Sequence, residues 1–362
     1  MSDIIIFTNS KLKLSKVKYK NMQRQLSEGK LLNATGNLNE AGYSTFLIKE
    51  YNRNDIKAGK SRIKEWDYYY VGNKKYGVAL TIADNSYMSL CSLSFLDFEK
   101  PFDITKSVMK WFTFGKTNLP SSSKEGDVFF KSKNVEMSFR HENGKRHLTC
   151  SWKKFTKDDK DVRLDLYLEE TNKDSIVVAT PFKKDRHFYY NQKINLLKSN
   201  GYVKIGEDIL DFNDDTYGVL DWGRGVWTYK NTWYWSSMSG EFEGKKIGFN
   251  LGYGFGDNST HSENIFFFDN KSYKLEDVRF DIPFTKTGKD SYLEPWKFRS
   301  VSGDINITFT PILNRHANMN VGIIKSLQNQ VFGKFSGYII VEGKEYFFTD
   351  MLGFAEKVTN KW

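Results

Sequence analysis

Cysteine is scarce in this chain, and no stretch of it stays apolar for long. The 362 residues include two cysteines, Cys91 and Cys150, which lie in strand-like runs without any paired spacing. A disulfide framework is therefore excluded, and this usage is typical of a reducing compartment. No run approaches the roughly 18 apolar residues of a membrane span, and the apolar island at residues 4–7 is too short for a signal-peptide core. We expect a soluble, cytoplasmic protein without a transmembrane segment.

Several catalytic signatures are also missing. The sequence has no glycine-rich phosphate loop with its lysine, no G-x-S-x-G elbow, no C-x-x-C pair and no H-E-x-x-H helix. The segment GYGFGDNS lies in strand-like sequence with no helix after it, so it is not a dinucleotide fingerprint. We expect no cofactor.

Aromatic residues, by contrast, are abundant. They make up 16% of the chain, and flat rings pack well on the half-buried surface of a pleated sheet. The net charge of +10 comes from lysines spread along the whole chain. That distribution is typical of a solvated surface, and lysines also keep sheet edges from pairing. We therefore expect no nucleic-acid partner, while peripheral contact with a membrane stays open.

The hydrophobic pattern predicts strands nearly everywhere. Apolar residues alternate at period two in runs that recur about every ten residues, such as residues 63–71, 76–82 and 87–95. Asn143-Gly144 is the strongest two-residue hairpin signal. The helical pattern is weak throughout, and its best candidate lies at residues 15–28.

A chain of this length exceeds what one core usually holds, so two domains are expected. Short, evenly spaced strands with polar hairpins allow a sheet to close on itself. We predict an all-β fold with few helices, built as two successive antiparallel barrels or sandwiches packed on each other. The predicted domains are residues 1–235, beginning with an extension of about 30 residues, and residues 236–362. No Pro/Gly linker marks the boundary, which falls between residues 195 and 255 and indicates a large shared interface.

The scarcest residue types gather between residues 217 and 268. Trp233 and Trp235 lie two apart on a predicted strand, so both indoles point to the same face. In the following run, apolar side chains that include Tyr253 alternate with glycines and with Asn250. One face of that strand is an apolar wall, and the other is nearly bare backbone. Glycine in a strand lets another group approach closely, which predicts either a bound ligand or a bulky ring from a facing strand.

A charged pair lies inside the same stretch. Asp221 and Arg224 stand in the sequence DWGRG among tryptophans. Such a pair is either a structural salt bridge or a functional pair with a perturbed proton affinity. We take these two residues as the candidate catalytic residues. The aromatic and polar residues of the stretch form the candidate ligand-binding set: Trp222, Trp227, Trp233, Trp235, Asn250, Tyr253, His261 and Glu263.

The loop after the glycine-rich strand holds Asp257, His261 and Glu263. A hard-metal site could be drawn from them, but one histidine and two carboxylates in a polar loop more often only solvate it. We assign no metal.

Other charged residues are weaker candidates. Glu65 and Asp67 alternate with aromatic residues on one strand, which predicts one exposed face and one core face. Arg315 and His316 follow a predicted strand and are candidates of the same weaker kind.

Longer motifs resemble a known family. The segments RIKEWDYYYV, YGVLDWGRGVWTYKNTWYW, GFNLGYGFGD with the following SEN, and QVFGKFSG with GFAEKV are similar to the domain-of-unknown-function 2804 family, DUF2804. The similarity runs from about Gly36 to the C-terminus. More distantly, the order of DWG and WYW resembles the hydroxyneurosporene synthase-like proteins, although that group usually has its acidic residue further upstream. This resemblance implies two lipocalin-like, or calycin, domains that bind hydrophobic ligands between or within the barrels.

Three functions are compatible with these residues. The resemblance implies a cofactor-free hydratase, cyclase or isomerase for a polyene or terpenoid-like molecule. Such chemistry needs a carboxylic acid kept protonated by an apolar pocket, and Asp221 among the tryptophans is of the right residue type, although a neighbouring Arg224 would lower its proton affinity. Aromatic faces would stabilise the carbocation. The second function is non-catalytic binding of a lipid or other apolar metabolite. The third, carbohydrate binding or cleavage, would require two carboxylates across a cleft. Whether the protein is an enzyme, and its oligomeric state, stay open.

Overall fold

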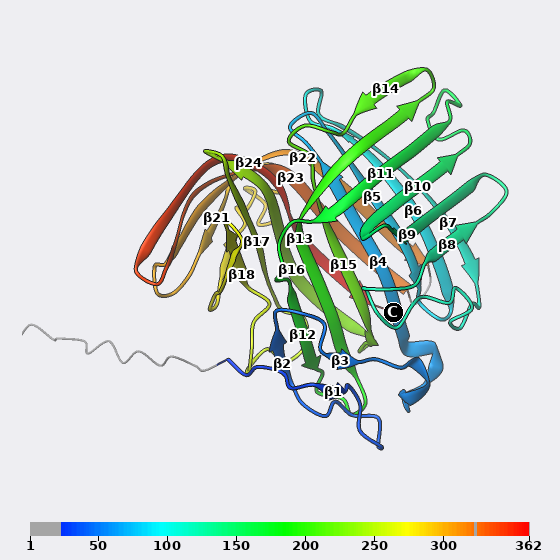
Figure 1. The fold of residues 1–362 in the computed structure, drawn as a ribbon, viewed down its shortest axis with the longest axis vertical. Helices are drawn as coiled ribbons and strands as arrows, with labels where there is room; N and C mark the ends of the chain where they lie inside the picture. The colour runs from blue at the N-terminus through cyan, green and yellow to red at the C-terminus, as the bar shows by residue number, and fades with distance from the viewer. Residues whose placement is uncertain (1–22, 322–323, 362) are drawn as a thin grey trace, which may run out of the picture.

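The computed structural model describes residues 23–321 and 324–361. Within these residues the regular elements are β-strands, apart from two 3-10 turns, η1 (Arg53–Asp55) and η2 (Lys60–Arg62). The described part of the predicted helix, residues 23–28, is not helical. Two large, strongly curled antiparallel sheets lie against each other (Figure 1). The predicted all-β fold with two antiparallel sheets packed on each other is thereby confirmed.

The first sheet has 13 strands. Its main path runs β7-β6-β5-β4-β15-β13-β11-β10-β9-β8, while β12 and β14 attach to β13, and β2 attaches to β12. A separate parallel pair, β1 (Gly29–Lys30) with β3 (Lys49–Glu50), lies outside it. The strands of the first sheet are β2 (Gly42–Ser44), β4 (Ile63–Gly72), β5 (Tyr76–Asp84), β6 (Met88–Asp97), β7 (Phe102–Trp111), β8 (Val128–Lys131), β9 (Val135–Glu142), β10 (Lys145–Trp152), β11 (Val162–Glu170), β12 (Ile176–Pro181), β13 (Phe188–Ile205), β14 (Asp208–Asp211) and β15 (Tyr217–Val226).

The second sheet has nine strands in the order β19-β18-β17-β16-β24-β23-β22-β21-β20. Three of them are unusually long and run side by side at its centre, as the orange and red arrows of Figure 1 show. The strands are β16 (Lys230–Phe242), β17 (Lys245–Tyr253), β18 (Ile265–Phe268), β19 (Lys271–Lys274), β20 (Arg279–Asp281), β21 (Trp296–Arg299), β22 (Ile305–Val321), β23 (Ile324–Val341) and β24 (Lys344–Lys361).

Local sequence explains the hairpins that build the first sheet. The predicted runs at residues 63–71, 76–82 and 87–95 correspond to β4, β5 and β6, which pair consecutively. Asn143 and Gly144 form the turn between β9 and β10, with φ angles of 51° and 73°. Two consecutive residues with positive φ match the twist of a tight hairpin, and asparagine and glycine tolerate that conformation best.

Each sheet encloses its own apolar core, and further apolar clusters lie between the sheets. Trp222 belongs to the core of the first sheet, and Phe249 to that of the second. Clusters of apolar residues around Trp227 and Phe354 pack in the contact between the sheets. All ten residues of β15 are consequently buried. A strand that is covered on both faces does not show the simple alternation of a half-exposed strand.

The chain passes from the first sheet to the second between Val226 and Lys230. The predicted boundary after residue 235 would cut β16, which belongs to the second sheet over its whole length. The division into two domains stays a prediction, since the two sheets share a buried contact.

Candidate functional site

Asp221 and Arg224 do not pair with each other. They lie three residues apart on β15, so alternation places their side chains on opposite faces of the first sheet. Arg224 is fully buried and donates to Asp67 Oδ1 on β4 at 3.0 Å, as well as to three backbone carbonyl oxygens. The expected Asp221–Arg224 pair is therefore corrected, because the arginine belongs to a structural ion pair in the first core.

The carboxylates of β4 are buried as well. Glu65 accepts a hydrogen bond from the Tyr51 hydroxyl at 2.7 Å and pairs with Arg53, while Asp67 pairs with Arg224. Both carboxylates are less than a tenth exposed. The prediction of an exposed face on this strand is wrong, because the curled first sheet covers that face with its own core.

Asp221 faces a cavity of about 590 Å³ between the two sheets. Small-molecule sites typically have volumes of about 300–1,000 Å³. The walls come from β4–β7, β13 and β15 of the first sheet and from β16 and β22–β24 of the second. Phe255 and Glu263, which follow β17, complete them. Met109 on the edge strand β7 is 42% exposed and lies at the rim, so the cavity opens beside that strand.

Residues in register across the first sheet form a polar row on one wall of the cavity. Lys193 on β13 lies opposite Asp221 on β15, which in turn lies opposite Tyr68 on β4. The row continues through Thr81 and Ser92 on β5 and β6. Because opposite residues on neighbouring strands point to the same face, these side chains reach the cavity together.

A second row faces it from the other sheet. Trp235 on β16 lies opposite Glu356 on β24, and Glu356 lies opposite Gln330 on β23. Arg315 on β22 ends the row opposite Gln330. The amide of Gln330 joins the two walls, since it accepts from the Tyr68 hydroxyl at 3.2 Å and donates to Glu356 Oε2 at 3.1 Å.

Lys193 is a buried cation of this cavity, with 3% of its surface exposed. Its Nζ lies 2.7 Å from Glu263 Oε2 and 4.0 Å from Asp221 Oδ1, and it donates to the Tyr189 hydroxyl at 3.1 Å. Burial disfavours the charged form, but the two carboxylates outweigh this effect, so the pKa of Lys193 lies above its usual value. The ammonium group therefore stays charged and offsets the charge of the acids around it.

Asp221 and Glu356 are carboxyl groups of the cavity that hold their protons more tightly than usual. Burial raises the pKa of Asp221 above its ordinary range, although Lys193 and a hydrogen bond from Asn191 oppose this. Burial also raises the pKa of Glu356 to about 7, against the hydrogen bond that Trp233 Nε1 donates to Glu356 Oε1 at 2.8 Å. At neutral pH Glu356 is therefore present in both its acid and its base form, which suits proton transfer in either direction.

Glu263 reaches the cavity because Gly252 has no side chain. A Cβ at Gly252 would overlap the Glu263 carboxylate. Asn250 lies behind both groups, fully buried, where it accepts from Trp235 Nε1 at 2.6 Å and donates to the Glu263 carbonyl oxygen at 2.8 Å. The close approach that the glycine-rich strand predicts is thus made by a side chain of this chain, and Asn250 positions Trp235 and Glu263.

Aromatic rings form the wall beside the acids. Trp66 stacks on Tyr189 with ring centroids 5.9 Å apart, and Trp227 meets Trp66 and Trp233 edge to face at 5.2 and 5.8 Å. Gly223 lies opposite Trp66 in the ladder, and a Cβ there would overlap the indole ring. The glycine of the DWG motif therefore seats this ring against bare backbone, and the rings hold one another in place.

A family model described as "Domain of unknown function (DUF2804)" matches residues 22–362. The chain belongs to the DUF2804 family. The resemblance that the sequence motifs carry is thereby confirmed. No curated protein matches the DUF2804 chain.

Solved structures are similar to this DUF2804 protein at low identity. A protein assigned as AttH from Nitrosomonas europaea has a TM-score of 0.50 and 10% identity, covering 86% of this chain and 98% of its own. Kievitone hydratase from Nectria haematococca has a TM-score of 0.47 and 13% identity, covering 87% and 96%. CghA in complex with Sch210972 has a TM-score of 0.43 and 7% identity, covering 93% and 97%. At 10% identity the likeness to the AttH structure shows the fold alone.

The structure brings half of the predicted site residues of the DUF2804 chain to the cavity. Asp221 lines it, together with Trp227, Trp233, Trp235 and Glu263. Their common placement follows from strand alternation on β15 and β16 and from the approach of the loop after β17. They form one connected set with Lys193 and Glu356.

The remaining predicted residues lie elsewhere. Trp222 packs in the core of the first sheet, on the face opposite Asp221. Tyr253 stacks on Tyr234 at 4.6 Å beside the core of the second sheet. His261 is buried and shares a hydrogen bond of 2.8 Å with Thr180, and burial lowers the pKa of His261 to about 4, so the ring is neutral at physiological pH. Arg224 and Asn250 are structural, as described above.

Lys193 and Glu356 are the candidate site residues that sequence reasoning missed. Lys193 stands in NQKINLL, a run of amide and apolar residues, and Glu356 stands in the mostly apolar run GFAEKV. The first ten residues of β13, residues 188–197, are all buried, so a lysine among them needs partners. A charged residue inside a run that otherwise reads as a buried strand is the signal that could have found them.

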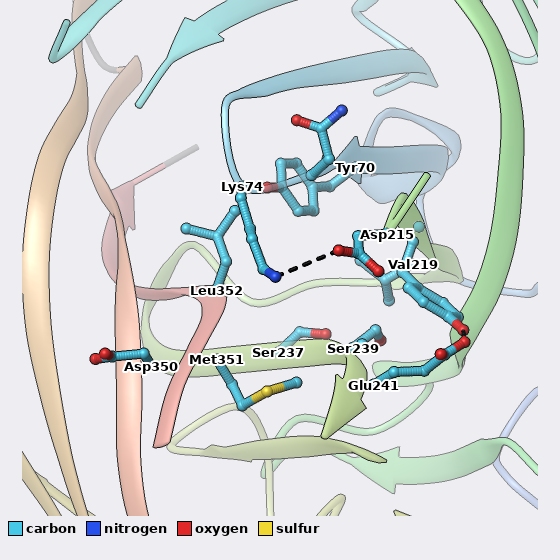
Figure 2. A pocket seen from close by; sticks show the side chains of 16 residues that line it. Tyr70, Lys74, Asp215, Val219, Ser237, Ser239, Glu241, Asp350, Met351 and Leu352 are labelled. Carbon is cyan, nitrogen blue, oxygen red and sulfur yellow. Dashed lines mark hydrogen bonds and ion pairs between the residues drawn. The ribbon is translucent and has the colours of Figure 1, made fainter. Parts of the chain in front are cut away.

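A smaller cavity of about 60 Å³ lies at another point of the contact between the sheets (Figure 2). Lys74 and Asp215 form an ion pair of 3.3 Å at its exposed side, and Tyr217 donates to Glu241. This volume holds waters but not an organic ligand of ordinary size. The larger cavity is therefore the candidate site.

Among the described residues, none of the helical segments is long and apolar enough to cross a bilayer. In the same residues, no three His, Cys, Asp or Glu side chains are grouped so that they could hold a metal ion.

Proposed function

We propose that this protein binds a hydrophobic small molecule in the cavity between its sheets and acts on it by proton transfer, as a cofactor-free hydratase, cyclase or isomerase. The observation that carries the proposal is the set of buried acids and the buried lysine beside an aromatic wall. An apolar ligand alone would need no such groups. Burying them costs stability, so their place in the cavity wall supports a functional role.

Glu356 is the proposed general acid. Its pKa of about 7 leaves a protonated fraction at neutral pH, and the groups that hold it, Trp233 and Gln330, keep its carboxyl in place. A group whose pKa lies near the working pH is the most effective proton donor and acceptor. Glu356 therefore takes the role that the sequence suggested for Asp221.

Asp221 is the proposed second acid–base group, on the opposite wall. Its carboxyl is held by Asn191 and faces Lys193, whose charge stays fixed. A proton delivered to a double bond by one acid leaves a cationic centre, which the faces of Trp233 and Trp235 can stabilise. The other carboxyl can then remove a proton or activate water.

The test uses deuterium oxide and a panel of polyenes, terpenoids and unsaturated lipids. We expect mass spectrometry to detect solvent deuterium in at least one compound, and Glu356→Gln to lower the rate of incorporation by about 100-fold or more. Glu345→Gln, an exposed glutamate on the same strand, is the matched control and should keep the wild-type rate.

Asp221→Asn completes the series and should also lower the rate. Full incorporation in both Glu356→Gln and Asp221→Asn would exclude the proposed mechanism. The alternative is a carrier, and it is favoured by the wide aromatic wall, which would hold an apolar ligand without any reaction. A compound that binds wild type and variants alike and is released without deuterium would establish carriage.

A further inference from the structure

We propose that Arg315 binds a carboxylate of the ligand, so that the molecule held in the cavity is an amphiphilic acid rather than a neutral hydrocarbon. This inference rests on the proposed function, because it assumes that the ligand occupies the larger cavity. It adds the chemical class of the ligand and its direction in the site.

The guanidinium group of Arg315 stands at one end of the cavity with most of its donors unused. Arg315 lines the cavity from β22 and is half-buried. Its NH1 donates to Ser94 Oγ on β6 of the first sheet at 2.8 Å, which fixes the side chain across the gap between the sheets. A guanidinium carries five N–H donors in a planar fork, so further donors remain for a ligand.

Arg315 also has no acidic partner among the described residues. None of the carboxylates of the described residues lies within ion-pair distance of Arg315. By contrast, Arg224 and Arg146 of the first sheet are each paired with a carboxylate. Asp103 lines the same end of the cavity, where burial raises its pKa and the charge of Arg315 opposes that rise, but its carboxyl group lies beyond ion-pair distance of the guanidinium. A cation held in a partly desolvated wall without a carboxylate at ion-pair distance is the arrangement that a carboxylate ligand would complete.

The distance from Arg315 to the acids orients the ligand. Arg315, Gln330 and Glu356 lie in register on three neighbouring strands. Strands are about 4.8 Å apart, so the backbone positions of Arg315 and Glu356 are separated by about 10 Å across the sheet. A ligand anchored by its carboxylate would therefore present a carbon several bonds along its chain to Glu356.

The rest of the cavity suits an apolar chain. Leu90, Met109 and Met319 line its open side, and the aromatic wall closes the far side. Among the described residues, the other Lys or Arg side chain that lines the cavity is Lys193 at the far end, and its ammonium group is already paired with Glu263 and Asp221. The carboxylate end of an amphiphile therefore has its best partner at Arg315.

Binding of an anion at Arg315 would also favour the reactive form of Glu356. The charge of Arg315 holds the pKa of Glu356 below the value that burial alone would give. A bound carboxylate offsets that charge, so the proton on Glu356 is held more tightly when the ligand is present. The acid would thus be protonated when its substrate arrives.

The experiment compares dodecanoic acid, 1-dodecanol and dodecyl phosphate, with binding followed by the fluorescence of the tryptophans that line the cavity. For the wild-type protein we expect the acid to bind more tightly than the alcohol. Arg315→Gln should weaken binding of the acid by at least about tenfold and leave the alcohol unchanged. Arg299→Gln, at an exposed arginine of the second sheet, is the control and should change neither.

Each other result has a distinct meaning. Equal loss of acid and alcohol in Arg315→Gln, or equal affinities in the wild type, would overturn the role of Arg315 while leaving the cavity as a binding site. Tighter binding of the phosphate than of the acid would overturn the choice of a carboxylate. Binding of none of the three would overturn both this inference and the cavity as a site for apolar chains. Should Arg315→Gln fail to fold, Arg315→Lys keeps the charge without the planar fork and should still weaken acid binding selectively.

Discussion

Replacing Glu356 by glutamine should stabilise the protein relative to wild type, and by more at about pH 8 than at about pH 5. The substitution keeps the shape of the side chain, and an amide can still accept from Trp233 Nε1. The amide of Gln330 can turn over, so that its oxygen accepts from the new NH₂ group and its nitrogen donates to the Tyr68 hydroxyl. The main physical change is therefore the loss of an ionisable group.

The sign and size of the effect follow from the pKa of Glu356. A glutamate has an ordinary pKa of 4.5, and in the fold this one has a pKa of about 7. Below 4.5 the group is protonated in the folded and unfolded states alike, so it costs nothing. As the pH rises towards 7, the unfolded chain releases the proton while the folded chain keeps it, and folding stability falls by roughly 3 kcal/mol in total. Glu356→Gln does not suffer this loss.

Urea unfolding at several pH values measures the difference. Between about pH 5 and about pH 8 the free energy of unfolding of Glu356→Gln, relative to wild type, should increase by about 2 to 3 kcal/mol. Other titrating groups cancel in this comparison because both proteins contain them. Glu345→Gln, at an exposed position on the same strand, should show no such trend. A difference between Glu356→Gln and wild type that does not change with pH would refute the raised pKa, and with it the proposed acid.

Two further substitutions test the architecture around the cavity. Gly223→Ala should displace the Trp66 ring, which the new Cβ would overlap, and should lower the free energy of unfolding by about 1–3 kcal/mol. The control is Gly59→Ala, where nothing lies within 4 Å of a Cβ, and it should be nearly neutral. Equal effects of the two variants in thermal unfolding would contradict the packing of Trp66 against Gly223. Asp67→Ala should lower the free energy of unfolding by about 3–5 kcal/mol, because it leaves the buried Arg224 guanidinium without its carboxylate. A loss below about 1 kcal/mol in urea unfolding would show that the backbone carbonyl groups are enough to stabilise the buried guanidinium.

Period-two alternation was enough to predict the fold and part of the site. It places Trp233 and Trp235 on one face, and both line the cavity. It also identifies the glycine face of β17, which the Glu263 carboxylate approaches at Gly252. The same rule, applied to β15, separates Asp221 from Arg224, and the expectation of a pair failed because closeness in sequence was weighed above strand geometry.

What alternation cannot supply is which strands face each other. Glu356 follows Trp235 by more than a hundred residues, and only the register of β16 with β24 brings them together. The burial of Glu65 and Asp67 depends in the same way on the curl of the first sheet over its own core. Such contacts are set by tertiary structure, which a single sequence does not show.

The acidity of Glu356 is a property of the contact between the sheets. The Glu356 carboxyl, the Trp233 indole and the Gln330 amide all belong to the second sheet. The indole and the amide hold the carboxyl in place, but they do not exclude water from it. The first sheet covers it, and it also brings Asp221, whose charge raises the pKa of Glu356, and Lys193, whose charge lowers it. Since burial is the largest cause of the raised pKa, a change that separates the sheets would return Glu356 to the behaviour of an ordinary glutamate. The buried contact between the sheets is therefore a requirement of the proposed chemistry and not only of the fold.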